Sequence, residues 1–417
     1  MKTITIHREQ PSANKVNRPS RAQEEVGLIH AGPRFTNALP PLSVYVHVPW
    51  CVQKCPYCDF NSHALKGEIA EEQYLQAIEA DLIHHLPHIW GRTIHTVFIG
   101  GGTPSLLSAS AMDRLLSMLR NLLGIAPTIE ITMEANPGTI EADKFKEFAA
   151  SGVNRISLGI QSFNDAHLKL LGRIHDASAA HRAIDIAQRY VERVNLDLMF
   201  ALPTQTLENH RRDLEQALAY DTEHLSLYNL TLEPNTVFAK YPPRDLPEDE
   251  LVDEMLEQNI ALTSVAGYEH YEVSAYAKKG GYARHNLNYW QFGDYLGIGP
   301  GAHGKISFHD KIIRTVNQRS PENWIANALK GDGSHQVEWR ELVAEEIPFE
   351  FMLNALRLRE GVDAALFIEH TGLAPIVMQK QLSQAIEKKL LEDSALRYQP
   401  TELGWRFLND LQAIFLD

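Results

Sequence analysis

The stretch YVHVPWCVQKCPYCDF, residues 45–60, contains all three cysteines of the protein, in the spacing C-x3-C-x2-C. It overlaps an apolar run, residues 43–48, whose composition predicts a buried strand. A loop after this strand would bring the thiols of Cys51, Cys55 and Cys58 close together. Three thiolates can hold three corners of a [4Fe–4S] cluster, and the last iron would then bind a group other than a protein thiol.

A disulfide and a zinc site are the two other chemical interpretations of the cysteines. A disulfide does not suit them, because their number is odd and the chain has the character of a cytosolic protein. A zinc site with His47 or His63 as fourth ligand stays open, because zinc accepts three cysteines and one histidine.

The cysteine spacing after a strand resembles the signature of the radical S-adenosylmethionine (SAM) superfamily. There the amino nitrogen and carboxylate of SAM occupy the open iron. The flanking segments, residues 45–51 and 58–63, resemble the HemW haem chaperones, a family related to the oxygen-independent coproporphyrinogen III oxidases. The resemblance extends from about Leu42 to the C-terminus. It implies three ligands, a [4Fe–4S] cluster, SAM and haem.

Composition limits the function classes. The chain has 417 residues, 44% of them hydrophobic, and a formal net charge of -14, which argues against nucleic acid as a partner. No run of about 18 apolar residues is present, so no membrane span is expected. Residues 1–40 lack hydrophobic periodicity and a signal-peptide core, and we expect a flexible extension on a cytoplasmic protein.

From residue 43 apolar runs and helical patterns alternate, which indicates parallel strands joined by crossover helices. Six such units predict a partial (β/α)6 barrel over residues 41–240, an α/β fold related to the TIM barrel. The expected strands are 43–48, 94–99, 128–133, 155–160, 193–200 and 224–230, and the expected helices are 70–86, 109–123, 140–150, 177–190 and 207–219.

Ligands of such barrels lie at the carboxyl ends of the strands, so unusual residues should follow each strand. The glycines of segment 100–105 would let a backbone approach a ligand, although a tight turn explains them equally well. Glu134 follows the third strand and suits ribose hydroxyls, or is a surface acid at a turn. Arg173 suits a carboxylate or a local acid, and Asp197 in an apolar strand needs a partner.

The resemblance gives these positions roles together. It implies that Tyr45 lies at the cluster, and that Gly101, Gly102 and Thr103 meet the methionyl group of SAM. It further implies that the SAM pocket is completed by Glu134, Gln161, Arg173 and Asp197.

Residues 241–345 are expected to extend the barrel, with a helix over 246–266 that turns Met255, Leu256 and Ile260 toward a core, and a strand near 271–277. A loop with the sequence HNLNYW, residues 285–290, follows. His285 could bind haem iron, or the loop could satisfy backbone groups and pack the domain joint. The H-N-x-x-Y-W motif of the HemW family implies haem binding through His285.

Residues 346–417 are expected to form a mainly α-helical, winged-helix-like domain. From Arg340 to Asp417 there are eight Lys or Arg and thirteen Asp or Glu, a balance that argues against DNA and favours a lid or docking role.

Three functions compete. The first is a haem chaperone that holds the cluster and SAM and delivers haem to apo-proteins such as membrane-associated respiratory enzymes. The second is a radical SAM coproporphyrinogen III dehydrogenase, and the third is a zinc-type binding module. The dehydrogenases carry a further cysteine two positions after the third cluster cysteine, where this chain has Phe60. Phe60 therefore favours the chaperone, and SAM turnover and homodimer formation stay open.

Overall fold

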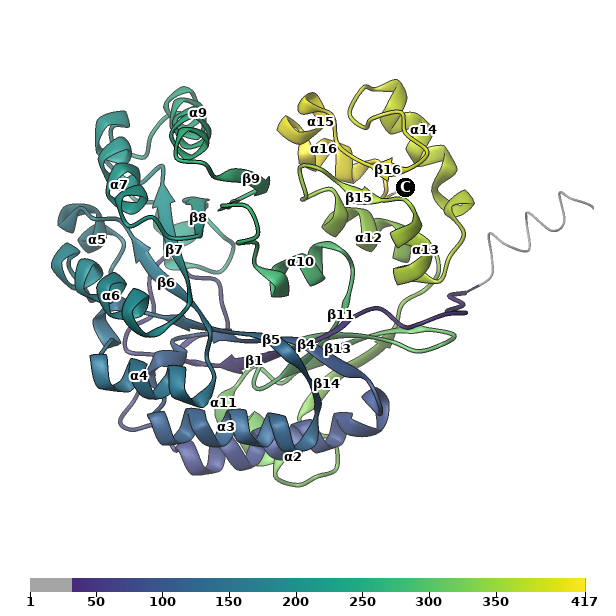
Figure 1. Ribbon diagram of the computed structural model, residues 1–417, viewed down its shortest axis with the longest axis horizontal. Coiled ribbons are helices and arrows are strands. Elements are labelled where there is room, and N and C mark those ends of the chain that lie inside the picture. The colour runs from purple at the N-terminus through teal and green to yellow at the C-terminus, as the bar shows by residue number, and fades with distance from the viewer. Residues whose placement is uncertain (1–31, 417) are drawn as a thin grey trace, which may run out of the picture.

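The computed structural model describes residues 32–416, which contain one large sheet with helices on its outer side and a smaller helical domain (Figure 1). Six consecutive parallel strands form the centre of the sheet, as the sequence predicts. They are β1 (Leu42–Val48), β4 (Thr93–Gly101), β5 (Gly124–Ala135), β6 (Arg155–Gln161), β7 (Arg193–Phe200) and β8 (His224–Asn229). The crossover helices are α2 (Glu71–Ile89), α3 (Ala109–Leu122), α4 (Ala142–Ser151), α6 (Ala177–Tyr190) and α7 (Leu207–Ala219), with the short α5 (Asp165–Leu170) before α6.

Burial and capping explain why the alternation forms. Strand β1 is buried on both faces, which is typical of a parallel sheet covered by helices, and Val46 pairs with Ile99 of β4. Side-chain caps stabilise the first turns of several crossover helices. Asp176 accepts a hydrogen bond from the Ala179 amide, and a threonine before α7 does the same.

Four further strands widen the sheet beyond β1, and the sequence did not predict them. They are β11 (Asp294–Ile298), which is parallel to β1, followed by the antiparallel strands β12 (His303–Ser307), β13 (Ile312–Asn317) and β14 (Gln336–Glu341). Helix α11 (Pro321–Ala328) precedes β14. A buried ion pair joins two of these strands, since Lys305 Nζ lies 2.7 Å from Asp294 Oδ1. A strand with a buried lysine does not stand out in a hydrophobic pattern.

The other edge of the sheet differs from prediction in two details. The single strand expected near 271–277 is a pair of antiparallel strands, β9 (Glu269–Glu272) and β10 (Ala275–Ala277). Helices α8 (Val237–Lys240) and α9 (Asp249–Val265) precede this pair. Met255 of α9 is buried as expected, but Leu256 and Ile260 are each 38% exposed. The helix buries Asn259 and Thr263 with Met255, because its packing face follows i, i+4, i+8 spacing.

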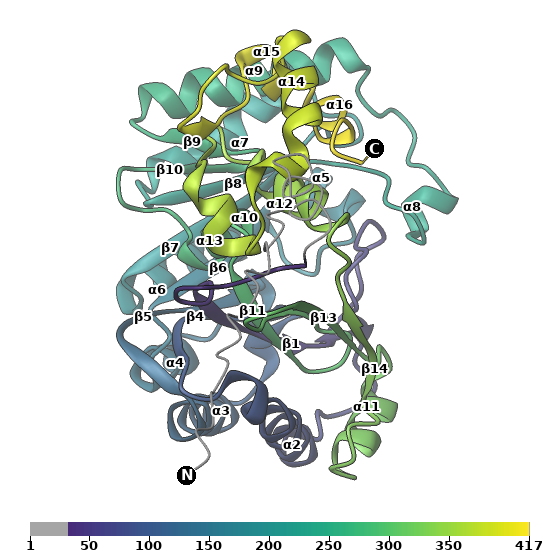
Figure 2. The same ribbon diagram turned by 90° about the vertical axis from the view of Figure 1, so that its right-hand side faces the viewer.

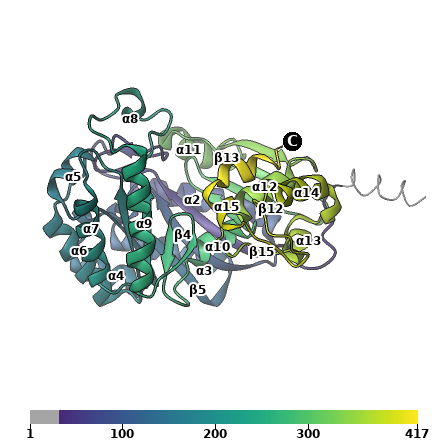
Figure 3. The same cartoon turned by 90° about the horizontal axis from the view of Figure 1, so that it is seen from above.

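The C-terminal domain has its own core and lies beside the barrel, with α10 (Arg284–Trp290) between them (Figures 2 and 3). Its elements are α12 (Ile347–Ala355), β15 (Val362–Asp363), α13 (Ala365–Thr371), a 3-10 turn (Pro375–Met378), α14 (Gln379–Glu387), β16 (Arg397–Tyr398), α15 (Glu402–Arg406) and α16 (Leu408–Ala413). Two further 3-10 turns, Pro104–Leu106 and Pro137–Thr139, lie in the barrel. The antiparallel pair of β15 and β16 agrees with the winged-helix-like order.

Most of the segment expected to be a flexible extension, residues 1–31, lies outside the described residues. The part that is described packs on the C-terminal domain, because the Arg34 amide donates to the Gly372 carbonyl and Phe35 is buried in that core. The prediction of a flexible extension is therefore wrong for residues 34 and 35. Among residues 32–416, no helix has the length and apolar character that a membrane crossing requires.

Candidate functional site

A cavity of about 660 Å³ lies at the carboxyl ends of the parallel strands. All residues that the sequence singled out for cofactors line it. They are Tyr45, Cys51, Cys55, Cys58, Gly101, Gly102, Thr103, Glu134, Gln161, Arg173, Asp197 and His285. The expectation that strand-end residues meet at one place therefore agrees with the geometry.

Of the three free thiols, that of Cys51 ends the short strand β2 (Trp50–Cys51), and those of Cys55 and Cys58 lie in the loop before β3 (His63–Ala64). Thr103 Oγ1 donates to Cys51 Sγ at 3.4 Å, and Arg173 Nη1 lies 3.6 Å from Cys55 Sγ. Burial raises the pKa of the Cys51 and Cys58 thiols, so metal binding would release protons from them. The three-thiol set fits a cluster with one open iron.

His47, the first candidate for a fourth zinc ligand, is fully engaged. Its Nε2 donates to the Asn61 carbonyl at 2.9 Å, and its Nδ1 accepts from the Tyr45 hydroxyl at 3.0 Å. Burial lowers its pKa to about 4, so the ring is neutral and its lone pair is taken by Tyr45. A zinc ion would have to displace that hydroxyl.

The glycine segment packs directly beneath the cysteine loop. The Gly102 amide donates to the Val48 carbonyl and the Thr103 amide to the Trp50 carbonyl, both at 2.7 Å. Gly101 has a φ of 109°, and a Cβ there would collide with the His47 ring. The glycines are thus required by this close backbone packing, which also places Thr103 at Cys51.

Two half-buried carboxylates face the cavity from β5 and β7, the strands on either side of β6. Glu134 accepts a hydrogen bond from the Gly101 amide at 3.0 Å, and Asp197 accepts from Ser157 and Asn195, each at 2.8 Å. Burial raises the pKa of Glu134 to about 7, with added repulsion from Asp197 and an opposing effect of the Gly101 bond. A ligand that brings hydroxyl donors or positive charge would restore the ionised carboxylate.

Arg173 supplies the complementary positive charge. Its Nη2 donates to the Gly159 carbonyl at 2.7 Å, while its Nε is buried without any partner among the described residues. A Cβ at Gly159 would lie 3.0 Å from Gln161 Nε2 and 3.2 Å from Arg173 Nη2, so the two side chains converge over this glycine. An unpaired buried Nε beside an amide group fits the carboxylate of an amino acid ligand.

Sequence reasoning missed several polar residues of the cavity wall, including Arg155, Ser157, Asn195 and Tyr228. Ser157 and Asn195 lie two positions before Gly159 and Asp197 on their strands, and therefore on the same face. That two-residue spacing was the available signal.

The H-N-x-x-Y-W segment lies in a helix, α10, so the prediction of a loop at residues 285–290 is wrong. Glu130 of β5 accepts hydrogen bonds from the amides of Arg284 and His285 at 3.3 and 3.1 Å, which stabilises the helix start. Thr96 donates its hydroxyl proton to Ser43. It is therefore the acceptor for His285 Nδ1 at 2.8 Å.

The remaining nitrogen of His285, Nε2, accepts from the Tyr289 hydroxyl at 2.8 Å. Burial and repulsion from Arg155 lower the pKa of His285 to about 3. Iron binding at His285 would break one of its two hydrogen bonds. The geometry thus agrees better with the packing alternative for this histidine.

Comparisons with known proteins give the class first. The Radical SAM superfamily model matches residues 45–217, and the HemN C-terminal domain model matches residues 342–407. The solved coproporphyrinogen III oxidase HemN of Escherichia coli superposes with a TM-score of 0.77 at 24% identity, over 94% of this chain and 93% of that chain, which shows the shared fold. Fold and site together define a radical SAM protein.

Curated relatives narrow the class to a family. The haem chaperone HemW of Escherichia coli is 50% identical over 91% of this chain and 99% of its own length. That of Haemophilus influenzae is 47% identical over 91% and 98%. A mouse protein named radical S-adenosyl methionine domain-containing protein 1, mitochondrial, is 36% identical over 83% and 79%. The chain belongs to the HemW haem chaperone family, whose radical SAM scaffold uses a [4Fe–4S] cluster and SAM.

The raised pKa of Glu134 predicts how SAM affinity depends on pH. Ligand hydroxyls bond best to the ionised carboxylate, so binding below pH 7 must first remove a proton. We expect affinity to rise by up to about tenfold per pH unit as pH approaches 7 from below, and to level off above it. Calorimetry on the cluster-reconstituted chain measures this directly. Glu134→Gln should flatten the profile, whereas Asp197→Asn separates any contribution of the second carboxylate. A wild-type affinity independent of pH would contradict the assignment of Glu134.

Proposed function

We propose that this protein is a haem chaperone that binds haem beside a [4Fe–4S] cluster and SAM and passes it to apo-proteins. The observation that carries the proposal is a second cavity, of about 570 Å³, that adjoins the SAM cavity. The two share a wall that includes Tyr45, Phe60, Glu134, Tyr289 and Trp290. Flat aromatic rings beside an open cavity of this size suit a macrocyclic ligand.

We assign residues of this chain to the cluster and to SAM as follows. Cys51, Cys55 and Cys58 hold the cluster, and Tyr45 lines the same cavity. SAM lies against Gly101, Gly102, Thr103, Glu134, Gln161, Arg173 and Asp197. When bound, the cluster supplies an electron that SAM can accept. The chain's own residues orient the two, because the cysteines and the residues assigned to SAM line one cavity.

The alternative, a coproporphyrinogen III dehydrogenase, is favoured by the fold shared with HemN and by the complete set of SAM-cavity residues. Phe60 argues against it. Its side chain is 57% exposed and lines both cavities, at the position where the dehydrogenases carry a further cysteine. An aromatic ring cannot supply a thiol at the shared wall.

Delivery is the further part of the proposal. We propose apo-proteins of the cytoplasm and membrane-associated respiratory enzymes as acceptors. The C-terminal domain is a suitable lid or docking element, because Asn354 of α12 lines the second cavity and the Arg357 guanidinium lies 4.4 Å from the Trp290 ring centre.

The test compares binding with conversion. The cluster is reconstituted anaerobically in the full chain, SAM is added, and either haem or coproporphyrinogen III follows, with HemN of Escherichia coli as the positive control for conversion. We expect a stable haem complex and no protoporphyrinogen IX. Formation of protoporphyrinogen IX, with 5′-deoxyadenosine in step, would replace the chaperone by the dehydrogenase. No haem complex and no product would refute both functions.

A further inference from the structure

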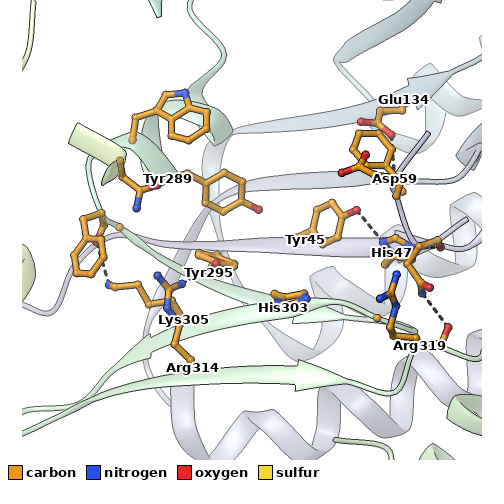
Figure 4. A pocket seen from close by; sticks show the side chains of 18 residues that line it. Tyr45, His47, Asp59, Glu134, Tyr289, Tyr295, His303, Lys305, Arg314 and Arg319 are labelled. Atoms are coloured by element: carbon orange, nitrogen blue, oxygen red, sulfur yellow. Dashed lines mark hydrogen bonds between the residues drawn. The ribbon is translucent and has the colours of Figure 1, made fainter. Parts of the chain in front are cut away.

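The second cavity contains a histidine that the sequence analysis did not single out. Figure 4 shows His303 between Tyr295 and Arg319 along one side of the cavity. His303 begins β12, and Lys305 shares its strand face because side chains alternate. Lys305 pairs across the sheet with Tyr295 of β11 and Arg314 of β13. One face of the antiparallel extension therefore supplies this wall.

His303 differs from the other histidines of the two cavities in its hydrogen bonds. His47 and His285 use both ring nitrogens within the protein. The exposed His303 side chain has no hydrogen-bond or ion-pair partner anywhere in residues 32–416. Partial loss of solvation at the cavity wall lowers its pKa, and Arg314 and Arg319 add repulsion while Glu338 opposes it. The ring is therefore neutral near pH 7, with a free lone pair directed to no protein group.

The tyrosines on the same wall are poorer iron ligands, because each of their hydroxyls already takes part in a hydrogen bond within the protein. The Tyr289 hydroxyl donates to His285, and the Tyr295 hydroxyl accepts from Arg314 Nη1 at 2.8 Å. Tyr45 donates to His47. Among the groups on this wall that could bind iron, the imidazole of His303 needs no internal bond to be broken.

Positive charge on the wall is distributed unequally. Lys305 is bound to Asp294, and Arg314 forms an ion pair with Glu350. Arg319 is exposed, and its guanidinium has no partner within the described part of the chain. A free guanidinium on a cavity wall matches a carboxylate of the ligand.

We propose that haem occupies this second cavity with His303 as the axial ligand of its iron and Arg319 as the partner of a propionate. The inference rests on the proposed function, since it assigns residues to the haem that the chaperone binds. It moves the ligand from His285 in the H-N-x-x-Y-W helix to a strand of the sheet extension. Tyr295, Tyr289 and Trp290 then contact the faces of the macrocycle.

The test uses two ligands, haem and iron-free protoporphyrin IX, and the full chain with its cluster. His303→Ala should remove the imidazole-ligand signature from the haem spectrum, and added imidazole should restore it. Binding of iron-free protoporphyrin IX should be unchanged, because that ligand has no iron to coordinate. Arg319→Ala should weaken both ligands about tenfold, the effect of one charge-assisted hydrogen bond.

The outcomes distinguish failure of the proposed function from failure of the iron-ligand assignment. A wild-type chain that binds no haem refutes the proposed function itself. A wild-type haem spectrum in His303→Ala, or loss of the imidazole signature in His285→Asn with His303 intact, overturns only the ligand assignment. Weaker binding of iron-free protoporphyrin IX to His303→Ala would also overturn it, because the histidine would then act by shaping the cavity.

Discussion

Replacement of Cys51 by alanine should abolish the [4Fe–4S] cluster, with iron and sulfide after reconstitution falling to background. Each of Cys51, Cys55 and Cys58 holds one corner, and within residues 32–416 the chain has no other thiol to substitute. Loss of one ligand leaves two, which is below what a stable cluster requires. The absorption band at roughly 400 nm, which is expected for thiolate-bound iron, should disappear with the metal.

The same experiment on Cys55→Ala and Cys58→Ala should give the same result, since the three thiols act as one ligand set. Far-ultraviolet circular dichroism of each variant checks that the fold persists without the cluster. Unchanged iron and sulfide in Cys51→Ala would refute the assignment. A chain purified with zinc and no iron would support the zinc alternative.

Replacement of Arg173 by alanine should weaken SAM binding by about 10- to 150-fold. A hydrogen bond to a charged group contributes about 1.5–3 kcal/mol, and about 1.4 kcal/mol corresponds to a factor of ten. The buried Nε of Arg173 has no partner among the described residues, so its N–H is available to donate a hydrogen bond to a ligand. Calorimetry with the cluster-reconstituted protein measures the change.

Two further variants make this result specific. Arg173→Lys keeps the charge but loses the planar fork, so we expect an intermediate affinity. Arg182 lies exposed on α6, outside the cavity lining, and donates to the Ser178 hydroxyl, so Arg182→Ala is a matched control that should bind SAM normally. Wild-type affinity in Arg173→Ala would remove the argument for a carboxylate partner.

The sequence alone determined the parts of this protein that depend on local pattern. The cysteine spacing lies within eight residues, Cys51 to Cys58, so no distant contact is needed to bring the thiols together. The alternation of apolar strands and amphipathic helices predicted the parallel sheet. Because parallel strands place their carboxyl ends at one edge, Glu134 could be expected near a ligand without coordinates. The family resemblance, and not the strand pattern, implied that Gln161 and Asp197 share its pocket.

The tertiary structure alone decided the features that depend on contacts distant in sequence. Helix α10 starts where Glu130 of β5 accepts hydrogen bonds from its first amides, a contact across 155 residues for His285. Thr96 engages His285 across 189 residues, so the H-N-x-x-Y-W histidine has no free nitrogen. In the extension from β11 to β14, a buried ion pair joins Asp294 of β11 to Lys305 of β12. These charged residues make the two strands difficult to recognise in a hydropathy pattern. The pairing of β12 with β13 sets His303 opposite Val316, and Arg319 follows the end of β13 by two residues, so both reach one cavity wall. Sheet register, which the sequence does not reveal, sets this arrangement.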